Sequence, residues 1–259
     1  SKQIVADPSD PTKTNPWVYK FAQNDDLAAT RLFQVMIARK ISTVALLYAD
    51  DGFGKSGAEA VAEIDKATPQ VEVVARKSFS VDLRSPEVIV ASIPADVGCV
   101  LVWGTSPGPA LLVPQIREKL PNAEIYLSHG DASPEFIKQV GTPLEGAIVV
   151  GSKVLTAISS PQTDRERVVA AFQAFWSARF PTPPSHFGGH ARDALESLLD
   201  VMSRSSRPID RQAIRDGIEE VGRFNGVTGS FHFTPEDHAG LTSEAFEAYV
   251  ISGGKFQIL

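Results

Sequence analysis

The chain has 259 residues, of which 43% are hydrophobic and 22% are charged, a composition typical of a globular protein with one large or two modest domains. The net charge is −6 and no run of Lys and Arg exceeds two residues, so the sequence excludes the basic surface that binds nucleic acid. The one cysteine, Cys99, cannot form an intrachain disulfide and is compatible with an oxidising or a reducing compartment.

The first 16 residues form a proline-containing segment. Pro8, Pro11 and Pro16, separated by Asp and Thr, favour extended or turning backbone over helix. Ser1–Gln3 lacks the charged-then-apolar pattern of a signal peptide, and no apolar run reaches about 18 residues. We expect a connector here, in a chain that is either a mature product or an internal fragment.

Between Trp17 and Gly151, short apolar runs alternate with helical stretches. The predicted strands are Thr43–Tyr48, Val71–Phe79, Val97–Trp103, Glu124–Leu127 and Ala147–Val150, and the predicted helices lie at about 25–39, 54–67, 86–94, 107–119 and 134–140. Strands that alternate with helices imply right-handed crossovers and a parallel sheet covered on both faces. The sequence therefore predicts a doubly wound α/β unit, with Cys99 as a small buried side chain in one strand.

After Gly151 the pattern changes to three helices without a strand between them. They are predicted at 164–179, 187–204 and 210–220, the last with Asp210 as its N-cap. Their apolar side chains recur on one face and need an apolar partner, for which a second sheet is the natural candidate. Because a βαβ unit takes about 30 residues, we expect that sheet in roughly a hundred residues ahead of Ser1. Strand signals return at Gly229–Phe233, Phe246–Ile251 and Lys255–Leu259.

One segment matches the nucleophile elbow of α/β hydrolases. Gly104-Thr105-Ser106-Pro107-Gly108 fits G-x-S-x-G between a predicted strand and a predicted helix, with Asp131 and later histidines in hydrolase order. The oxyanion hole of that elbow uses the backbone N–H after the serine, and Pro107 has none. A strand-to-helix turn is the favoured interpretation, and a hydrolase that uses Ser106 is the alternative.

Two other segments have some features of cofactor or metal sites. Asp50–Gly57 follows a strand and opens a helix, but it matches neither glycine-rich phosphate motif, and its two aspartates would repel phosphate. His186 and His190 are one helical turn apart, but Gly188-Gly189 between them weakens the helix and no zincin glutamate accompanies them. The sequence predicts neither a cofactor nor a metal.

Ser128-His129-Gly130-Asp131 follows the strand Glu124–Leu127, at the carboxyl edge where open α/β sheets bind ligands. Consecutive side chains at a strand end point in different directions, which argues against a catalytic dyad of Ser128 and His129. A neutral His129 that gives one hydrogen bond to a ligand or to the backbone is the favoured interpretation.

Several short strings carry a family resemblance through their order and spacing. They are Trp17–Asp25, Val44–Gly54, Ser133–Phe136, Glu145–Ala147, the helix from His190 through Asp193-Ala194, and Phe224–Gly229. Together they resemble the type I periplasmic binding proteins of branched-chain amino-acid ABC transport, the leucine/isoleucine/valine-binding family. Members of this family have two α/β lobes joined by three crossing segments and close on the ligand as the lobes hinge together.

The resemblance implies a periplasmic-binding-protein type I fold, with one doubly wound parallel sheet lobe plus the helices of a second, incomplete lobe. Residues 1–24 would be a crossing segment and 25–151 the second α/β lobe. Residues 152–222 would be the C-terminal helical part of the first lobe, and 223–259 a crossover and terminal strands that return to the second lobe. The sheet of the first lobe, with loops that hold the ligand's carboxylate and amino group, would precede Ser1.

The resemblance also implies roles for individual residues. Phe53 falls where the family places an aromatic ring against the ligand, Thr105 where many members have a second one, and Ser128–Asp131 where some place an acid for the ligand's amino group. The expected ligand-binding residues are Phe53, Thr105, Ser106, Ser128, His129 and Asp131. Because His129 departs from the amino-acid pattern, an aromatic or other organic acid is an alternative to an amino acid.

We therefore expect an extracytoplasmic solute-binding protein, not an enzyme, which binds a small carboxylate ligand between two lobes. It would act in the periplasm, or outside the cell and tethered to the membrane, and deliver the ligand to the membrane permease of an ABC transporter. No nucleic-acid partner is expected. A ligand-sensing domain of a receptor or regulator uses the same fold and is a further alternative.

Overall fold

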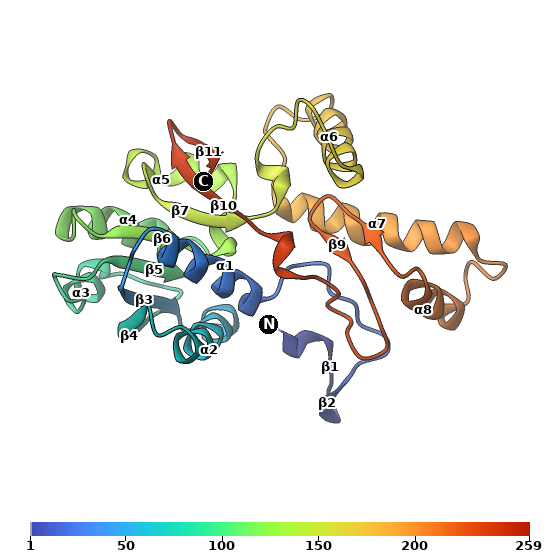
Figure 1. The fold of residues 1–259 in the computed structure, drawn as a ribbon, viewed down its shortest axis with the longest axis horizontal. Helices are drawn as coiled ribbons and strands as arrows, with labels where there is room; N and C mark the ends of the chain where they lie inside the picture. The colour runs from blue at the N-terminus through green and yellow to red at the C-terminus, as the bar shows by residue number, and fades with distance from the viewer. Residues whose placement is uncertain (1) are drawn as a thin grey trace. The chain divides into compact units, whose positions relative to one another are not determined.

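Five parallel strands and two antiparallel strands form a seven-stranded sheet in the computed structural model, which describes residues 2–259 (Figure 1). The strand order is β11-β10-β7-β6-β5-β3-β4; β3 to β7 pair in parallel, whereas β10 pairs antiparallel with both β7 and β11. The strands are β3 (Thr43–Ala49), β4 (Glu72–Phe79), β5 (Cys99–Trp103), β6 (Glu124–Leu127), β7 (Ile148–Gly151), β10 (Glu247–Ser252) and β11 (Lys255–Ile258). The predicted parallel α/β unit is confirmed, and the terminal strands extend it.

Helices cover both faces of this sheet. They are α1 (Asp25–Ala38), α2 (Gly52–Ala67), α3 (Pro86–Ala91), α4 (Gly108–Lys119) and α5 (Pro134–Val140). On one face, Leu32 and Phe33 of α1 belong to the same buried cluster as Leu101 of β5. Every residue of β5 is buried, including those that alternate to the opposite face, and α4 contacts this strand. Burial on both faces explains the continuous apolar runs of the central strands.

Short polar side chains cap the first turns of several helices. The Asp51 carboxylate accepts from the Gly54 N–H at 2.7 Å, and Ser133 Oγ accepts from the Phe136 N–H at 3.1 Å. Asp210, the predicted cap, accepts from the Ala213 N–H at 2.8 Å. These bonds satisfy amide groups that have no partner within the helix, so each helix starts where its cap stands.

The chain divides into two units: 25–151 with 246–259, which holds the seven-stranded sheet, and 1–24 with 152–245. The second of these contains α6 (Asp164–Ser177), α7 (His186–Arg204) and α8 (Arg211–Glu220), together with a short pair of strands, β8 (Phe224–Asn225) and β9 (Ser230–Phe231). Three helices without an intervening strand match the sequence prediction for 164–220. We call these two parts the sheet unit and the helical unit.

The segment 223–259, expected to contain a crossover and terminal strands, divides between the two units. Residues 223–245 group with the helical unit, and residues 246–259 group with the sheet unit. The carboxylate of Asp193 in α7 accepts from the backbone N–H groups of Val227 and Thr228, at 2.7 and 2.8 Å. Phe231 and Phe233 pack their rings against Phe21. These contacts join residues far apart in sequence, so local patterns do not show them.

The segment before residue 17 is extended or turning, as expected, but it also pairs with itself. Residues Lys2–Val5 form a 3₁₀ turn, and β1 (Ala6–Asp7) pairs antiparallel with β2 (Asp10–Thr14). Asp7 accepts from both the N–H and the hydroxyl of Ser9 at the turn. Local hydrogen bonds of this kind favour a turn, and they explain a hairpin in a segment expected to be a simple connector.

The helical unit leaves apolar side chains exposed. Along α7, Phe187, Leu195, Leu198 and Leu199 are between 36% and 55% exposed. Beside them a groove of about 520 Å³ is lined mainly by apolar residues of α6 and α7, among them Phe175. We call the four exposed side chains of Phe187, Leu195, Leu198 and Leu199 the α7 stripe. Within residues 2–259, no helix has both the length and the apolar character needed to cross a membrane.

Candidate functional site

Three loops meet at the carboxyl edge of the parallel strands. They follow β3, β5 and β6 and contain Phe53, Gly104 and Gly130. The hydroxyl of Ser128 donates to the Gly104 carbonyl at 3.3 Å. A Cβ atom added to Gly130 would lie 2.6 Å from that carbonyl oxygen and 2.7 Å from the Phe53 ring, so the close approach requires glycine. The loops therefore form one continuous surface, at the edge where open α/β sheets bind ligands.

The ring of Phe53 lies over buried aromatic side chains. It is half-buried and meets the His129 ring edge-on, with centroids 5.3 Å apart. His129 is 7% exposed and also contacts the rings of Trp103 and Phe246, at 5.9 and 5.5 Å. Its Nε2 lies 3.8 Å from the carboxylate of Asp25. His129 is therefore part of the layer beneath Phe53, and Phe53 is the member of this group that is partly exposed.

Asp131 is buried at the same edge and supports the neighbouring loop. It is 3% exposed, and the backbone N–H of Ser106 donates to its carboxylate. Its Oδ2 has no hydrogen-bond partner among the described residues. Burial raises the pKa of this carboxyl well above its usual range, and the hydrogen bond from Ser106 opposes that shift. The Asp131 side chain thus faces the interior, where it holds the loop of residues 104–107.

Thr105, Ser106 and Pro107 are the exposed members of that loop. The Ser106 hydroxyl donates to Oε1 of Gln139 at 3.0 Å. An amide oxygen does not take up the proton of a serine hydroxyl, so this bond does not activate Ser106 as a nucleophile. The next residue, Pro107, has no N–H for an oxyanion and is joined to Ser106 by a cis peptide bond.

The structure adds a fourth loop that the sequence analysis missed. Because β4 is parallel to β3, its following residues lie at the same edge. The backbone N–H of Asp50 donates to the Phe79 carbonyl at 2.9 Å, and the N–H of Val81 donates to the Asp50 carboxylate at 3.3 Å. Val81 is 44% exposed, so it presents an apolar side chain beside the Phe53 loop. Ligands of open α/β sheets bind at the carboxyl ends of the parallel strands. This carboxyl-edge rule, applied to β4 as to the other strands, predicts the position of the fourth loop.

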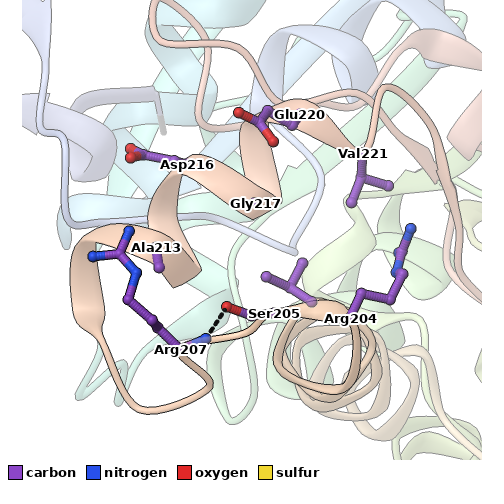
Figure 2. Close-up of a pocket in the computed structure, with 9 residues that line it drawn as sticks. Arg204, Ser205, Arg207, Ala213, Asp216, Gly217, Glu220 and Val221 are labelled. Carbon is purple, nitrogen blue, oxygen red and sulfur yellow. Dashed lines mark hydrogen bonds between the residues drawn. The ribbon is translucent and has the colours of Figure 1, made fainter.

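The helical unit has a separate hollow of about 410 Å³ between α7 and α8 (Figure 2). Arg204, Arg207, Asp216 and Glu220 bring charges of both signs to it, and Figure 2 shows these side chains spread around the hollow rather than converging on one point. A Cβ added to Gly217 would lie 2.5 Å from a methyl carbon of Val201. The hollow therefore lies beside a close helix contact, and its mixed charges do not define one ligand.

Two histidines, His186 and His190, lie one helical turn apart on α7. The rings of His186 and His190 stack with centroids 5.1 Å apart on α7, and His190 Nε2 lies 2.8 Å from Oε1 of Gln23. Across residues 2–259, no group of three or more His, Cys, Asp or Glu side chains is arranged to hold a metal ion. The aromatic edge of the sheet unit is therefore the best-supported candidate for a binding surface.

Comparisons with known proteins point to one family. Residues 3–255 match the family described as periplasmic binding protein. A comparison with curated protein sequences gave no match. Among solved structures, the fold is similar to a protein of Rhodopseudomonas palustris CGA009, with a TM-score of 0.86, 22% identity, and 94% of this chain and 71% of that chain covered.

Two further solved structures are similar to this chain. An extracellular ligand-binding receptor from Rhodopseudomonas palustris HaA2 has a TM-score of 0.84 at 25% identity, covering 95% of this chain and 70% of that chain. The leucine-binding protein LivK of Thermotoga maritima has a TM-score of 0.77 at 19% identity, covering 98% and 70%. The α/β fold of this chain is therefore similar to that of type I periplasmic binding proteins.

Proposed function

Because the chain belongs to the periplasmic binding protein family, we propose that it is the solute-binding component of an ABC transporter and binds a small carboxylate ligand without changing it chemically. The observation that carries this proposal is the convergence of four strand-end loops on a surface with a partly exposed Phe53 ring. Small-molecule sites combine an apolar surface with a few placed polar groups, and this edge has both.

Phe53, Thr105 and Ser106 are the proposed contact residues from the sheet unit. A half-buried ring and two exposed hydroxyl groups can meet an apolar ligand body and its polar substituents. Ser128, His129 and Asp131 were expected to touch the ligand as well. Their burial supports an indirect role, in which they hold the loops and the Phe53 ring in position.

The proposed ligands are a branched-chain or other amino acid, or an aromatic acid. An aromatic ring and Val81 favour an apolar ligand body. The LivK neighbour is named as a leucine-binding protein, and this supports leucine as one candidate at the level of fold. A single thermal-shift screen can separate the two ligand classes.

The proposed partner is a membrane permease, and the proposed location is the periplasm or the outer side of the cell membrane. Both follow from the family and from the neighbour named as an extracellular receptor. The alternative, a hydrolase that uses Ser106, predicts turnover of an activated ester that Ser106→Ala abolishes. The Ser106–Gln139 bond favours binding over catalysis.

The test is a thermal-shift screen of the chain with leucine, phenylalanine, benzoate and 4-hydroxybenzoate, accompanied by a 4-nitrophenyl acetate assay. Under the proposal, at least one carboxylate raises the melting temperature in a saturable manner, because a ligand that binds the folded state stabilises it by mass action. Ester turnover should equal that of Ser106→Ala. Turnover lost in Ser106→Ala, without any stabilising carboxylate, would support the hydrolase instead.

A further inference from the structure

A histidine in the helical unit faces two hydrogen-bond acceptors at once. His238 is fully buried; its Nδ1 lies 3.0 Å from the carbonyl oxygen of Val18, and its Nε2 lies 3.2 Å from Oε1 of Glu219 in α8. The Tyr19 ring stacks on the imidazole with centroids 4.0 Å apart and an interplanar angle of 18°. The Tyr19 hydroxyl donates to the same Glu219 oxygen at 2.9 Å. Each nitrogen of the His238 ring therefore faces an oxygen atom that accepts hydrogen bonds.

A neutral imidazole cannot satisfy both contacts. It carries one N–H, so its other nitrogen would present a lone pair to a carbonyl or to a carboxylate, neither of which carries a hydrogen to donate. Either tautomer leaves one repulsive contact inside the protein. Both contacts become hydrogen bonds if the ring carries two N–H groups, one donated to Val18 and one to Glu219. A proton on the carboxyl group instead is the less favourable placement, since the reference pKa is about 4.3 for Glu and about 6.5 for His.

We propose that His238 is a buried imidazolium paired with Glu219, and that this pair fastens residues 18–20 to α8. Three contacts of that segment depend on the ring's position. The Val18 carbonyl accepts from the ring, Tyr19 stacks on it, and the Lys20 N–H donates to the His238 carbonyl at 2.8 Å. These residues belong to the segment 1–24, which leads into α1 at Asp25.

Neighbouring charges are compatible with this pair. Arg215 is bonded to Asp216 beside it on α8, and Asp237 accepts from the N–H groups of Ala239 and Gly240. Lys20 directs its ammonium group to Gln23 and Asn24. Burial and the Glu219 carboxylate raise the pKa of the Tyr19 hydroxyl above its usual range, so this group remains a donor. The carboxylate oxygen nearest His238 thus faces two donors when the ring is charged.

The direction of the pH dependence follows from the positive charge of the His238 ring. The clamp, meaning the two hydrogen bonds of this ring, is complete while the ring holds both protons. Deprotonation leaves a lone pair against the Glu219 carboxylate or the Val18 carbonyl. Raising the pH therefore weakens the attachment of residues 18–20, and lowering it does not, until Glu219 itself takes up a proton. The device would loosen this segment in alkaline conditions.

The test is nitrogen-15 NMR of the chain labelled at its histidine rings, at about pH 7, where an unperturbed histidine with a pKa of about 6.5 is mostly neutral. His238→Asn identifies the signals, with His238→Gln as a second variant should the first not fold. We expect both His238 nitrogens to have the shift of a protonated nitrogen. The ring of His232, which is exposed, provides the reference signals for comparison.

Glu219→Gln distinguishes a charged clamp from a merely buried ring. Its amide can donate to Nε2, so it accommodates a neutral imidazole while keeping the size and shape of the side chain. In this variant Nε2 should become an unprotonated acceptor, and the stability of the parent chain relative to Glu219→Gln should fall as the pH rises above about 6.5. One unprotonated His238 nitrogen in the parent chain at about pH 7 would overturn the proposal, as would two protonated nitrogens in Glu219→Gln.

Discussion

Phe53 is the aromatic ring that the strand-end loops offer to a ligand. Its ring rests edge-on against His129 and stays half-exposed, so substitution removes contact area without opening the interior. Phe53→Ala should weaken binding of the carboxylate found in the screen by about 1–3 kcal/mol, the order of burying one apolar side chain. This corresponds to about a 5- to 150-fold rise in Kd by calorimetry.

Phe175→Ala is the matched control for Phe53. Phe175 is an exposed ring on α6, in the helical unit, and its loss should leave Kd unchanged. An unchanged Kd in Phe53→Ala would remove Phe53 from the site. A large effect of Phe175→Ala would place the ligand in the groove between α6 and α7.

Ionisation of the buried Asp131 carboxyl lowers the stability of the folded chain by an amount that depends on pH. Its folded-state pKa is raised by burial, so the folded chain holds the proton more tightly than the unfolded chain and loses stability as pH rises through and above the unfolded value. Asp131→Asn cannot ionise, and its side-chain oxygen can still accept from the Ser106 N–H. The stability of Asp131→Asn relative to the parent chain should therefore grow by about 1 kcal/mol or more from about pH 4 to pH 8.

Urea unfolding at several pH values measures this difference. Glu135→Gln, at an exposed position in the first turn of α5, is the control and should show no comparable trend. A constant difference between Asp131→Asn and the parent chain would mean that Asp131 does not change its protonation in this range.

The sequence does not show which of the expected site residues are buried. The loops of Phe53, Ser106 and His129 lie at the predicted edge because strand order and the carboxyl-edge rule depend on local patterns. Whether a side chain turns inward depends on packing between loops, such as Gly130 against Gly104. That contact joins residues 26 positions apart, and no periodicity reports it.

At the scale of elements, Gly217 sets how closely α7 and α8 pack. Alanine in an exposed helix is normally favoured over glycine by about 1 kcal/mol. A Cβ at residue 217 would, however, lie 2.5 Å from a methyl carbon of Val201. Gly217→Ala should therefore lower the free energy of unfolding by about 1–3 kcal/mol, the usual cost of overpacking.

The double variant Gly217→Ala with Val201→Ala tests the cause. Removing the opposing methyl groups should make the added Cβ neutral or stabilising relative to Val201→Ala alone, as measured by chemical unfolding of all four chains. A penalty of the same size in both backgrounds would mean that the clash is not responsible.

Helices and strands were predictable where their signals are local. The cap at Asp210 and the central strands follow from single side chains and short apolar runs. The grouping of residues 223–245 with the helical unit was not predictable, because it depends on the hydrogen bond between Asp193 of α7 and the backbone of Val227. Glycine at 226 makes room for it, since a Cβ there would lie 2.5 Å from the carboxylate. Such a glycine is recognisable only once its neighbour is known.

At the scale of the whole molecule, the α7 stripe should drive association of this 259-residue chain. Contiguous exposed apolar surface favours contact with other apolar surface. We expect light scattering to show a mass that rises with concentration, and Leu195→Glu with Leu199→Glu to suppress the rise. Val88→Glu, which places a glutamate at an exposed valine of α3, is the control and should not suppress the rise. A concentration-independent monomer mass would contradict this prediction.

The antiparallel strand β10 has a consequence for synthesis of the chain. Tyr249 of β10 pairs with Val149 of β7, a separation of 100 positions, so the sheet stays unfinished while the whole helical segment between them leaves the ribosome. During that time the edge of β7 has unpaired amide and carbonyl groups that can capture other strands. A nascent chain of this topology is therefore exposed to wrong strand pairing at this edge until its last strands arrive.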